Sequence, residues 1–267
     1  MKKFYKKKFF DYDFFDISEA FEKLNLNFGD TIYITGDLFK LGRYNRRDSI
    51  LNDLYKLIIN KIGKRGTICF PTHSWKLLNS NSIFIPNQTK SETGAFTEFL
   101  RKKKSVRQDH PYSSVSSIGK FSDYICKNNS RSVYGKKSPF EKLIKLNAKI
   151  INFGLHPRFC CSSVHHSELL ANVPYRYKKF FYQKVFDKKK IIKKKYSMFV
   201  LKEKYLNIKR NKNKIIFNHF QKKNIILKSK LGRDYIYAYS LADFHKDNIS
   251  LFKTNKFAWL GYKPKKI

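Results

Sequence analysis

The feature of this sequence that most restricts its fold is a buried strand, an amphipathic helix and a second buried strand in close succession. GDTIYITG at 29–36 reads as a turn followed by an apolar strand, and GTICFPTHSW at 66–75 repeats the pattern. Residues 47–62 place their apolar side chains on one helical stripe, and Gly63 follows where a C-cap is expected. A helix between two buried strands predicts a βαβ unit, and therefore an α/β fold with helices flanking a central sheet.

Further segments continue this alternation. We expect helices over 16–26, 93–103 and 138–147, strands over 113–119 and 148–155, and a strand with a short helix over 232–248. Capping residues mark two of the helix starts. Asp16 and Glu19 have the spacing of a capping box, whereas Ser138 and Pro139 are typical of an N-cap and a first helical position.

The chain of 267 residues is expected to form a single domain over 1–267. Residues 177–230 differ from the rest because they are basic, β-like and rich in turns. No linker of Gly, Ser or Pro separates them from their surroundings. We therefore interpret 177–230 as a basic, β-rich insertion on the acceptor side of that domain.

The charge of the chain is unusual. Lys and Arg number 57 against 20 Asp and Glu, which gives a formal net charge of +37. Such an excess attracts polyanions, although an AT-rich genome also enriches lysine without functional cause. Aromatic residues make up 16% of the chain, which excludes a disordered polycation. A nucleic-acid-binding protein is an alternative, but no helix-turn-helix, zinc-finger or RNP motif accompanies the charge, so specific nucleic-acid recognition is not expected.

Cysteines and hydropathy indicate the compartment. The four cysteines form no CxxC pair and lack the density of a disulfide scaffold, which favours reduced thiols. No stretch approaches the roughly 20 apolar residues of a membrane-spanning helix, and the first residues do not resemble a signal peptide. We expect a cytoplasmic protein with no membrane span.

The segment SSVHHSELLANVPYR at 162–176 carries the clearest chemistry. Cys160, Cys161, His165 and His166 lie within seven positions, which raises a zinc site, but adjacent cysteines and adjacent histidines rarely aim at one ion. No metal is therefore expected.

Catalysis is the second interpretation of this segment. Ser162, His165 and Glu168 are three apart, so a helix would bring them to one side. A carboxylate beside a histidine fixes its tautomer and supports it as a general base. His166 projects about 100° away on such a helix and is expected to support rather than react.

Seven landmarks in order extend the argument beyond this segment. They are GDT, PT with a following aromatic, the TG helix, HPYSS, SPF, SSVHHSE and VPYR. Together they resemble the aminoglycoside 3-N-acetyltransferase family over roughly residues 16–250. The resemblance implies a mixed α/β fold distinct from the GNAT fold. It also implies an acetyl-CoA-dependent N-acetyltransferase that acts on a small-molecule amino sugar.

The resemblance also implies site residues. His165 matches the catalytic histidine and Glu168 its neighbouring glutamate, and Ser162 stands where threonine is usual. The implied cofactor-binding residues are Thr35, Gly36, Ser114, Ser138 and Phe140. The implied substrate-binding residues are Asp37, Thr72, His110 and Arg176. The chain departs from the family at 35–37, where it has Thr-Gly-Asp in place of a His-Ser-Ser-like segment.

The lysine content indicates which charge the acceptor carries. Aminoglycosides are polycations, whereas 177–230 is rich in lysine, so an acceptor with negative charge is favoured. We expect an amino sugar linked to a nucleotide or belonging to a surface-polysaccharide precursor, with aminoglycoside acetylation as the alternative. A homodimer is left open.

Overall fold

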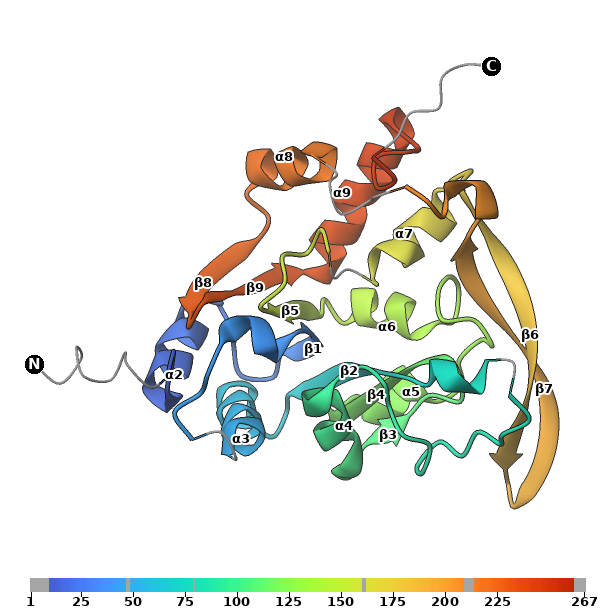
Figure 1. Cartoon of the computed structure of the whole chain (residues 1–267), viewed down its shortest axis with the longest axis horizontal. Coiled ribbons are helices and arrows are strands. Elements are labelled where there is room, and N and C mark those ends of the chain that lie inside the picture. Colours follow the sequence, from blue (N-terminus) through green and yellow to red (C-terminus); the bar gives the residue numbers. More distant parts are fainter. Residues whose placement is uncertain (1–9, 47–48, 79, 160–161, 209–213, 262–267) are drawn as a thin grey trace, which may run out of the picture.

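A seven-stranded mixed sheet forms the centre of the computed structural model, which describes residues 10–46, 49–78, 80–159, 162–208 and 214–261 (Figure 1). Its strand order is β3-β4-β2-β1-β5-β9-β8. Only β1 with β2 and β1 with β5 pair in parallel among these strands. The strands are β1 Thr31–Gly36, β2 Thr67–His73, β3 Val106–Arg107, β4 Ser113–Gly119, β5 Lys149–Phe153, β8 Leu227–Leu231 and β9 Asp234–Ser240.

The predicted βαβ unit is confirmed. β1 runs through α3, Ile50–Ile62, to β2, and Ile32 lies opposite Ile68 in the parallel register. Ile32 and Ile34 pack on one side of the sheet with α3, whereas Tyr33 between them packs on the other. The apolar residues of β1 therefore serve both faces, as expected of a strand in the middle of a covered sheet.

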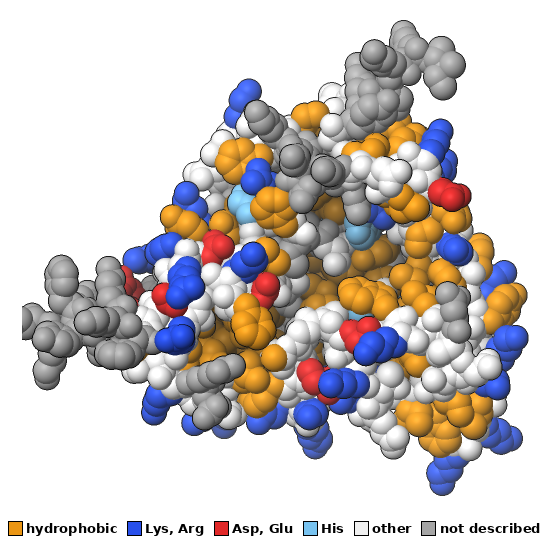
Figure 2. Space-filling view, in the orientation of Figure 1, with side chains coloured by type: hydrophobic (Ala, Val, Ile, Leu, Met, Phe, Trp, Pro, Cys, Tyr) orange, Lys and Arg blue, Asp and Glu red, His pale blue; other side chains and the backbone are white. Residues whose placement is uncertain are grey.

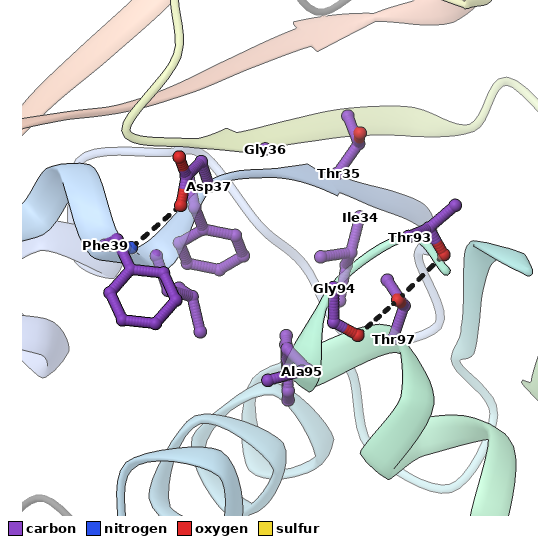
Figure 3. Close-up of a pocket in the computed structure, with 12 residues that line it drawn as sticks. Ile34, Thr35, Gly36, Asp37, Phe39, Thr93, Gly94, Ala95 and Thr97 are labelled. Atoms are coloured by element: carbon purple, nitrogen blue, oxygen red, sulfur yellow. Dashed lines mark hydrogen bonds between the residues drawn. The ribbon is translucent and has the colours of Figure 1, made fainter. Parts of the chain in front are cut away.

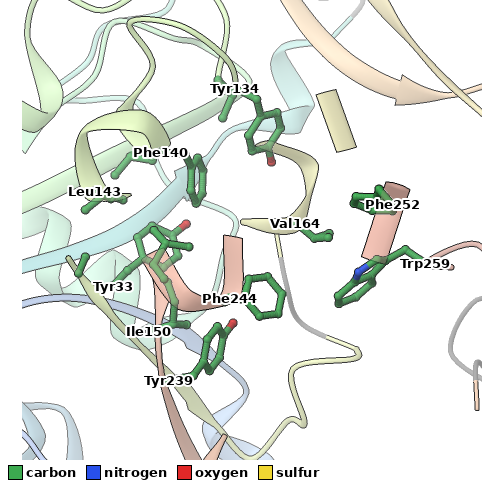
Figure 4. Packing of buried hydrophobic residues seen from close by; sticks show 14 of the residues in the cluster. Tyr33, Tyr134, Phe140, Leu143, Ile150, Val164, Tyr239, Phe244, Phe252 and Trp259 are labelled. Atoms are coloured by element: carbon green, nitrogen blue, oxygen red, sulfur yellow. The ribbon is translucent and has the colours of Figure 1, made fainter. Parts of the chain in front are cut away.

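Helices cover both faces of the sheet. On one face α2, α3 and α4 pack over β1, β2 and β5, and on the other lie α5, α6, α7, α8 and α9. Figure 4 shows this second core, in which Tyr33 and Ile150 from the sheet meet Phe140, Val164 and Phe244 from the helices. The remaining helix bounds are α2 Phe14–Glu22, α4 Ala95–Lys102, α5 Ser122–Cys126, α6 Pro139–Lys145, α7 Val164–Leu170, α8 Lys214–Lys223 and α9 Leu241–Thr254, with 3-10 turns η1 Leu38–Leu41, η3 Trp75–Leu77 and η4 Glu203–Tyr205.

Two helix predictions need correction at their ends. Asp13, not Asp16, is the N-cap of α2, and Asp16 completes the capping box by accepting from the Asp13 N–H. The helix therefore begins earlier than the apolar spacing indicated. The closing helix α9 is not short, because its apolar face continues to Phe252 in the core. The Ser138 cap of α6 is confirmed, since its hydroxyl accepts from Glu141 N at 3.3 Å.

The segment 177–230 contributes to three places. Most of it forms a two-stranded ribbon, β6 Arg176–Asp187 with β7 Lys190–Leu201, which lies along one edge of the molecule (Figure 1). The rest supplies α8, which packs in the second core, and β8, which joins the central sheet beside β9. The lysine-rich segment is thus tied to the main fold at both its ends.

Within the described residues, no helix combines the length and the apolar character needed to cross a bilayer. Cys69 and Cys126 are buried free thiols. Burial raises the pKa of the Cys126 thiol to about 12, so this thiol stays protonated.

Gly36 should be intolerant of any side chain. Its φ is +115°, and an added Cβ would lie 2.2 Å from the Phe153 carbonyl oxygen of the paired strand β5. We expect Gly36→Ala to lower the free energy of unfolding by about 3 kcal/mol or more. Gly94→Ala is the matched control, because Gly94 has a φ of +116° but nothing within 4 Å of the added Cβ. It should cost only roughly 1 kcal/mol for the backbone conformation. Equal losses in urea denaturation would show that the contact with β5 is unimportant.

Candidate active site

The candidate site is centred on α7, which follows β5 by way of a loop. Val164, the first residue of the helix, is buried in the second core (Figure 4), and α7 packs against α9. This anchoring fixes the rotation of the helix. His165 is therefore left partly exposed while His166, Ser167 and Glu168 are buried.

His165 and Glu168 form the pair that their spacing predicted. Nδ1 of His165 lies 2.5 Å from Oε2 of Glu168. The side chain of His165 is 25% exposed and that of Glu168 only 2%. The imidazole can therefore be reached from outside, whereas the carboxylate acts only through it.

Two neighbours hold the Glu168 carboxylate from its other sides. The Tyr175 hydroxyl donates to Oε1 at 2.7 Å. Nε of Arg176 lies 2.7 Å from Oε2, an ion pair in which the N–H is not directed at the oxygen. Tyr175 lies in the VPYR turn and Arg176 begins β6. Val173 N donates to the Glu168 carbonyl at 3.1 Å, which fixes that turn against the helix.

These contacts determine the protonation state of Glu168. Burial alone would raise the pKa of Glu168, but the charge and hydrogen bond of His165, followed by Arg176 and Tyr175, lower it to about 2. Glu168 is therefore ionised at neutral pH and accepts the proton on Nδ1 of His165. When His165 is neutral, this hydrogen bond keeps its proton on Nδ1 and leaves the lone pair on Nε2, which is the form that a general base requires.

Tyr134 and Tyr175, for which the sequence predicted no role, complete the surroundings together with the predicted residue Phe140. The ring of Tyr134 meets that of His165 edge-on at 5.5 Å between centroids, and Phe140 packs behind Tyr134 at 5.2 Å. Tyr175 was quoted within VPYR but given no role. Its donor position could have been suspected from that motif, whereas the approach of Tyr134 depends on a loop 31 residues earlier in the chain.

His166 has a supporting place, as expected. It is 3% exposed, its Nδ1 accepts from Gly135 N at 3.2 Å, and its ring lies 5.2 Å from that of His245. Burial lowers its pKa to about 4, so it is neutral. Its hydrogen bond ties the loop that carries Tyr134 to α7.

Ser162 lies in the turn before α7. Its carbonyl accepts from His165 N at 3.2 Å, so it helps to set the start of the helix. The predicted role of its hydroxyl stays a prediction. Arg176 is 8% exposed and also donates to the Phe199 carbonyl at 3.2 Å, which supports a role in holding Glu168. Its predicted contact with substrate likewise stays untested.

Thr35, Gly36 and Asp37 line a pocket at the end of β1 (Figure 3). The opposite wall comes from the start of α4, where the Thr93, Thr97 and Gly94 oxygens are linked by hydrogen bonds. The Asp37 carboxylate accepts from Phe39 N at 3.0 Å and caps η1. The pocket walls are mainly apolar; its lining residues are Ile34, Thr35, Gly36, Asp37, Leu38, Phe39, Thr93, Gly94, Ala95, Phe96, Thr97 and Phe153.

Thr72 and Ser114 are fully buried instead of lining a surface. Their hydroxyls lie 3.1 Å apart, and the Ser114 hydroxyl also accepts from Nε of Arg107 at 2.8 Å. The Arg107 guanidinium donates to the carbonyls of Pro86, Thr89 and Thr72 and to the hydroxyls of Ser114 and Ser74. The geometry supports a packing role for both predicted residues at this end of the sheet.

His110, Ser138 and Phe140 are also buried, each at 1% exposure or less. His110 donates from Nε2 to the Ser197 carbonyl at 3.3 Å, and its Nδ1 accepts from Ser113 N at 3.2 Å. These bonds hold β7 against the start of β4. Direct ligand contacts by these three residues remain predictions, and the structure gives each a supporting place.

No group of three or more potential metal ligands occurs in the part of the chain that the structure describes. Cys160 and Cys161 lie outside that part, so the zinc hypothesis for them is not addressed by the geometry.

Comparison with known proteins identifies the family of the chain and structures that share its fold. The family model described as aminoglycoside 3-N-acetyltransferase matches residues 38–252. No curated protein matches the chain in sequence.

Solved structures share the fold at low identity. Aminoglycoside acetyltransferase AAC(3)-Xa is 15% identical with a TM-score of 0.77, and the alignment covers 90% of this chain and 92% of that one. YokD from Bacillus subtilis is 19% identical with a TM-score of 0.74, covering 91% and 99%. AAC-IIIb in a binary complex with CoASH is 17% identical with a TM-score of 0.75, covering 91% and 96%.

Because His110 is neutral in the folded chain, we expect the free energy of unfolding to depend on pH. Burial lowers its pKa to about 4, whereas an unfolded histidine titrates near 6.5. Between these values the unfolded chain takes up a proton that the native chain does not, so the free energy of unfolding should fall as the pH falls from 7 to 5. His110→Gln should reduce this slope by up to about 1.4 kcal/mol per pH unit.

The measurement is urea denaturation of both proteins across this range. Above pH 8 the two curves should run parallel, because His110 is then neutral in both states. An unchanged slope below pH 7 in the variant would contradict the assignment.

Proposed function

The chain belongs to the aminoglycoside 3-N-acetyltransferase family, and we propose from this premise that it transfers the acetyl group of acetyl-CoA to an amino group of a small-molecule acceptor. The observation that carries the proposal is the pair of a reachable imidazole and a buried, ionised carboxylate, His165 and Glu168. Such a pair is suited to removing a proton from an attacking amine.

The reaction needs one proton carrier. As the amine nitrogen bonds to the thioester carbonyl carbon, Nε2 of His165 takes its proton, and the Glu168 charge stabilises the imidazolium that forms. The carbon–sulfur bond then breaks, and the proton returns to the CoA thiolate. No covalent intermediate on the protein is required. Tyr175 and Arg176 serve this step by keeping the carboxylate in place.

We assign the pocket beside Thr35 and Gly36 to the donor. None of its twelve lining residues is Lys or Arg, and Asp37 is its one charged residue. A diphosphate would gain nothing there, whereas the uncharged pantetheine arm of CoA suits its apolar walls. The replacement of a His-Ser-Ser-like segment by Thr-Gly-Asp is compatible with this use, because the Asp37 carboxylate is engaged by the Phe39 N–H.

We further propose that the acceptor molecule carries negative charge. Three acidic side chains near α7 are engaged: Glu168 as described, Glu141 of α6 by Lys137 N, and Asp247 of α9 by His219. A polycation would need such carboxylates for itself. An amino sugar on a nucleotide or polysaccharide precursor suits the lysine excess better. Aminoglycoside acetylation is the second candidate, and the description of the matching family favours it.

Release of free thiol from acetyl-CoA tests the proposed reaction. His165→Ala should lower turnover by a factor of about 100 or more, since general base catalysis contributes on that order. Among acceptors, nucleotide-linked amino sugars should show a higher kcat/KM than kanamycin-type aminoglycosides. His219→Ala is the matched control, because His219 also pairs with a carboxylate, Asp247, but has no role in the reaction.

Three outcomes are informative. Full activity of His165→Ala would reject the base, and equal losses in His219→Ala would point to a general effect on folding. A higher kcat/KM for the aminoglycoside would establish the second candidate. Absence of thiol release with every acceptor would reject the transferase reaction as proposed.

Filling the pocket tests the donor assignment separately. Ala95 is exposed at the pocket rim, so Ala95→Trp can occupy the space without disturbing the core. We expect the KM for acetyl-CoA to rise roughly tenfold with little change in kcat, because binding of the arm is lost and the base is untouched. Lys102→Trp, at the exposed end of the same helix, should leave both constants unchanged. An unchanged KM in Ala95→Trp would remove the donor from this pocket.

A further inference from the structure

The ribbon β6–β7 has two chemically distinct faces. Its strands pair in register from Arg176 with Leu201 to Asp187 with Lys190, so side chains alternate between the faces along each strand. On the inner face Phe181, Val185 and Tyr196 pack into a small core. That core is completed by Leu77, Phe84 and Tyr112 from the main fold.

The outer ribbon face consists of the residues that alternate with these, and it is exposed. Phe180 is 55% exposed, Tyr182 60%, Phe186 43% and Ile191 55%. In Figure 2 hydrophobic side chains gather at the lower right, where Figure 1 places the far end of the ribbon, and lysine and arginine side chains border them. Its members are Phe180, Tyr182, Lys184, Phe186, Ile191, Lys193 and Lys195.

The charge on this face has one sign. Asp187 is the only acidic residue of the two strands, and Lys194 binds it at 2.9 Å. The turn adds exposed Lys188 and Lys189. The outer ribbon face therefore combines apolar side chains with uncompensated positive charge, which is complementary to an anionic partner.

Single-stranded nucleic acid and anionic lipid both bind to surfaces that combine aromatic residues with lysine. The contacts within the outer ribbon face distinguish between these two partners. Single-stranded nucleic acid stacks its bases on open ring faces. Here Nζ of Lys195 lies over the Phe180 ring at 4.3 Å, and Nζ of Lys193 lies over Tyr182 at 5.5 Å. An ammonium group therefore covers one face of each of these two rings. Ile191, at the far end of the face, offers no surface for stacking but buries well among acyl chains.

We propose that the outer ribbon face docks on an anionic lipid surface. Its rings and Ile191 enter the boundary between headgroups and acyl chains, while the lysines remain at the level of the acidic headgroups. β6 starts at Arg176, which contacts Glu168, and its 12 residues span roughly 40 Å. A docked ribbon thus holds the catalytic pair within about that distance of the lipid.

Co-sedimentation of the full chain with vesicles tests this docking. We expect binding to mixed phosphatidylcholine and phosphatidylglycerol vesicles but not to phosphatidylcholine alone. The combined variant Lys184→Gln, Lys193→Gln, Lys195→Gln should bind roughly a hundredfold more weakly, since each lysine near such a surface contributes a factor of about five. The matched control Lys64→Gln, Lys104→Gln, Lys253→Gln removes the same charge from exposed positions elsewhere and should change binding less than about threefold.

A second measurement separates insertion from simple attraction. Tyr182→Trp should show added fluorescence that brominated acyl chains quench, whereas the unchanged protein should show little quenching. The combined variant Phe180→Ser, Tyr182→Ser, Phe186→Ser should bind mixed vesicles at least about tenfold more weakly. Circular dichroism and thiol release with a soluble acceptor verify that each variant is folded.

Several results would overturn the proposal. Equal weakening by the control lysines would mean diffuse attraction to the whole surface, and absence of quenching would exclude insertion. Loss of binding to a single-stranded oligonucleotide in the ribbon variants, with vesicle binding absent throughout, would assign the face to nucleic acid instead.

Discussion

The buried carboxylate of Glu168 is the constraint around which the site is arranged. A charged group with 2% exposure survives in a protein interior only when several partners compensate for lost water, and here a histidine, a phenol and a guanidinium do so. Each partner comes from a different element: helix, turn and ribbon. Their positions are therefore fixed together, and the orientation of His165 results from all three.

The sheet explains why this arrangement stands where it does. β5 is parallel to β1, so the chain leaves both strands at the same edge, and in open α/β sheets ligands bind at that edge. The loop after β5 leads to α7, and the loop after β1 contributes to the apolar pocket. Gly36 at the end of β1 lies close to Phe153 at the end of β5, so the two loops start side by side. A residue without a side chain is therefore required at position 36 for structural reasons, whatever ligand binds.

Much of the fold could be predicted because its signals are local. The apolar period of residues 47–62, the cap at Ser138 and the three-residue spacing of His165 and Glu168 each depend on neighbours within one or two turns of chain. The resemblance supplied the mixed sheet, and the family match bears it out. Pairing of β4 against β2 in the antiparallel sense was not predicted, since both directions give the same apolar strand pattern.

Other features depended on distant contacts. Binding roles were predicted for Thr72, Ser114 and His110. Their polar side chains are instead buried, in contact with Arg107, β4 and β7. Tyr134 approaches His165 from a loop that no periodicity marks. The α8 helix was not predicted, because it lies in a lysine-rich and turn-rich segment and its apolar residues pack against partners far along the chain, such as Phe244 and Trp259.

The contacts of Glu168 have a consequence for how such a protein can change over time. Among the described residues, its polar side-chain partners all lie within the single stretch 165–176, so the carboxylate and the groups that hold it can be inherited together as one short segment. The outer ribbon face and the loops that supply none of these partners can diverge without disturbing it. Such a lineage can thus change its outer surfaces while the buried carboxylate and its partners stay constant.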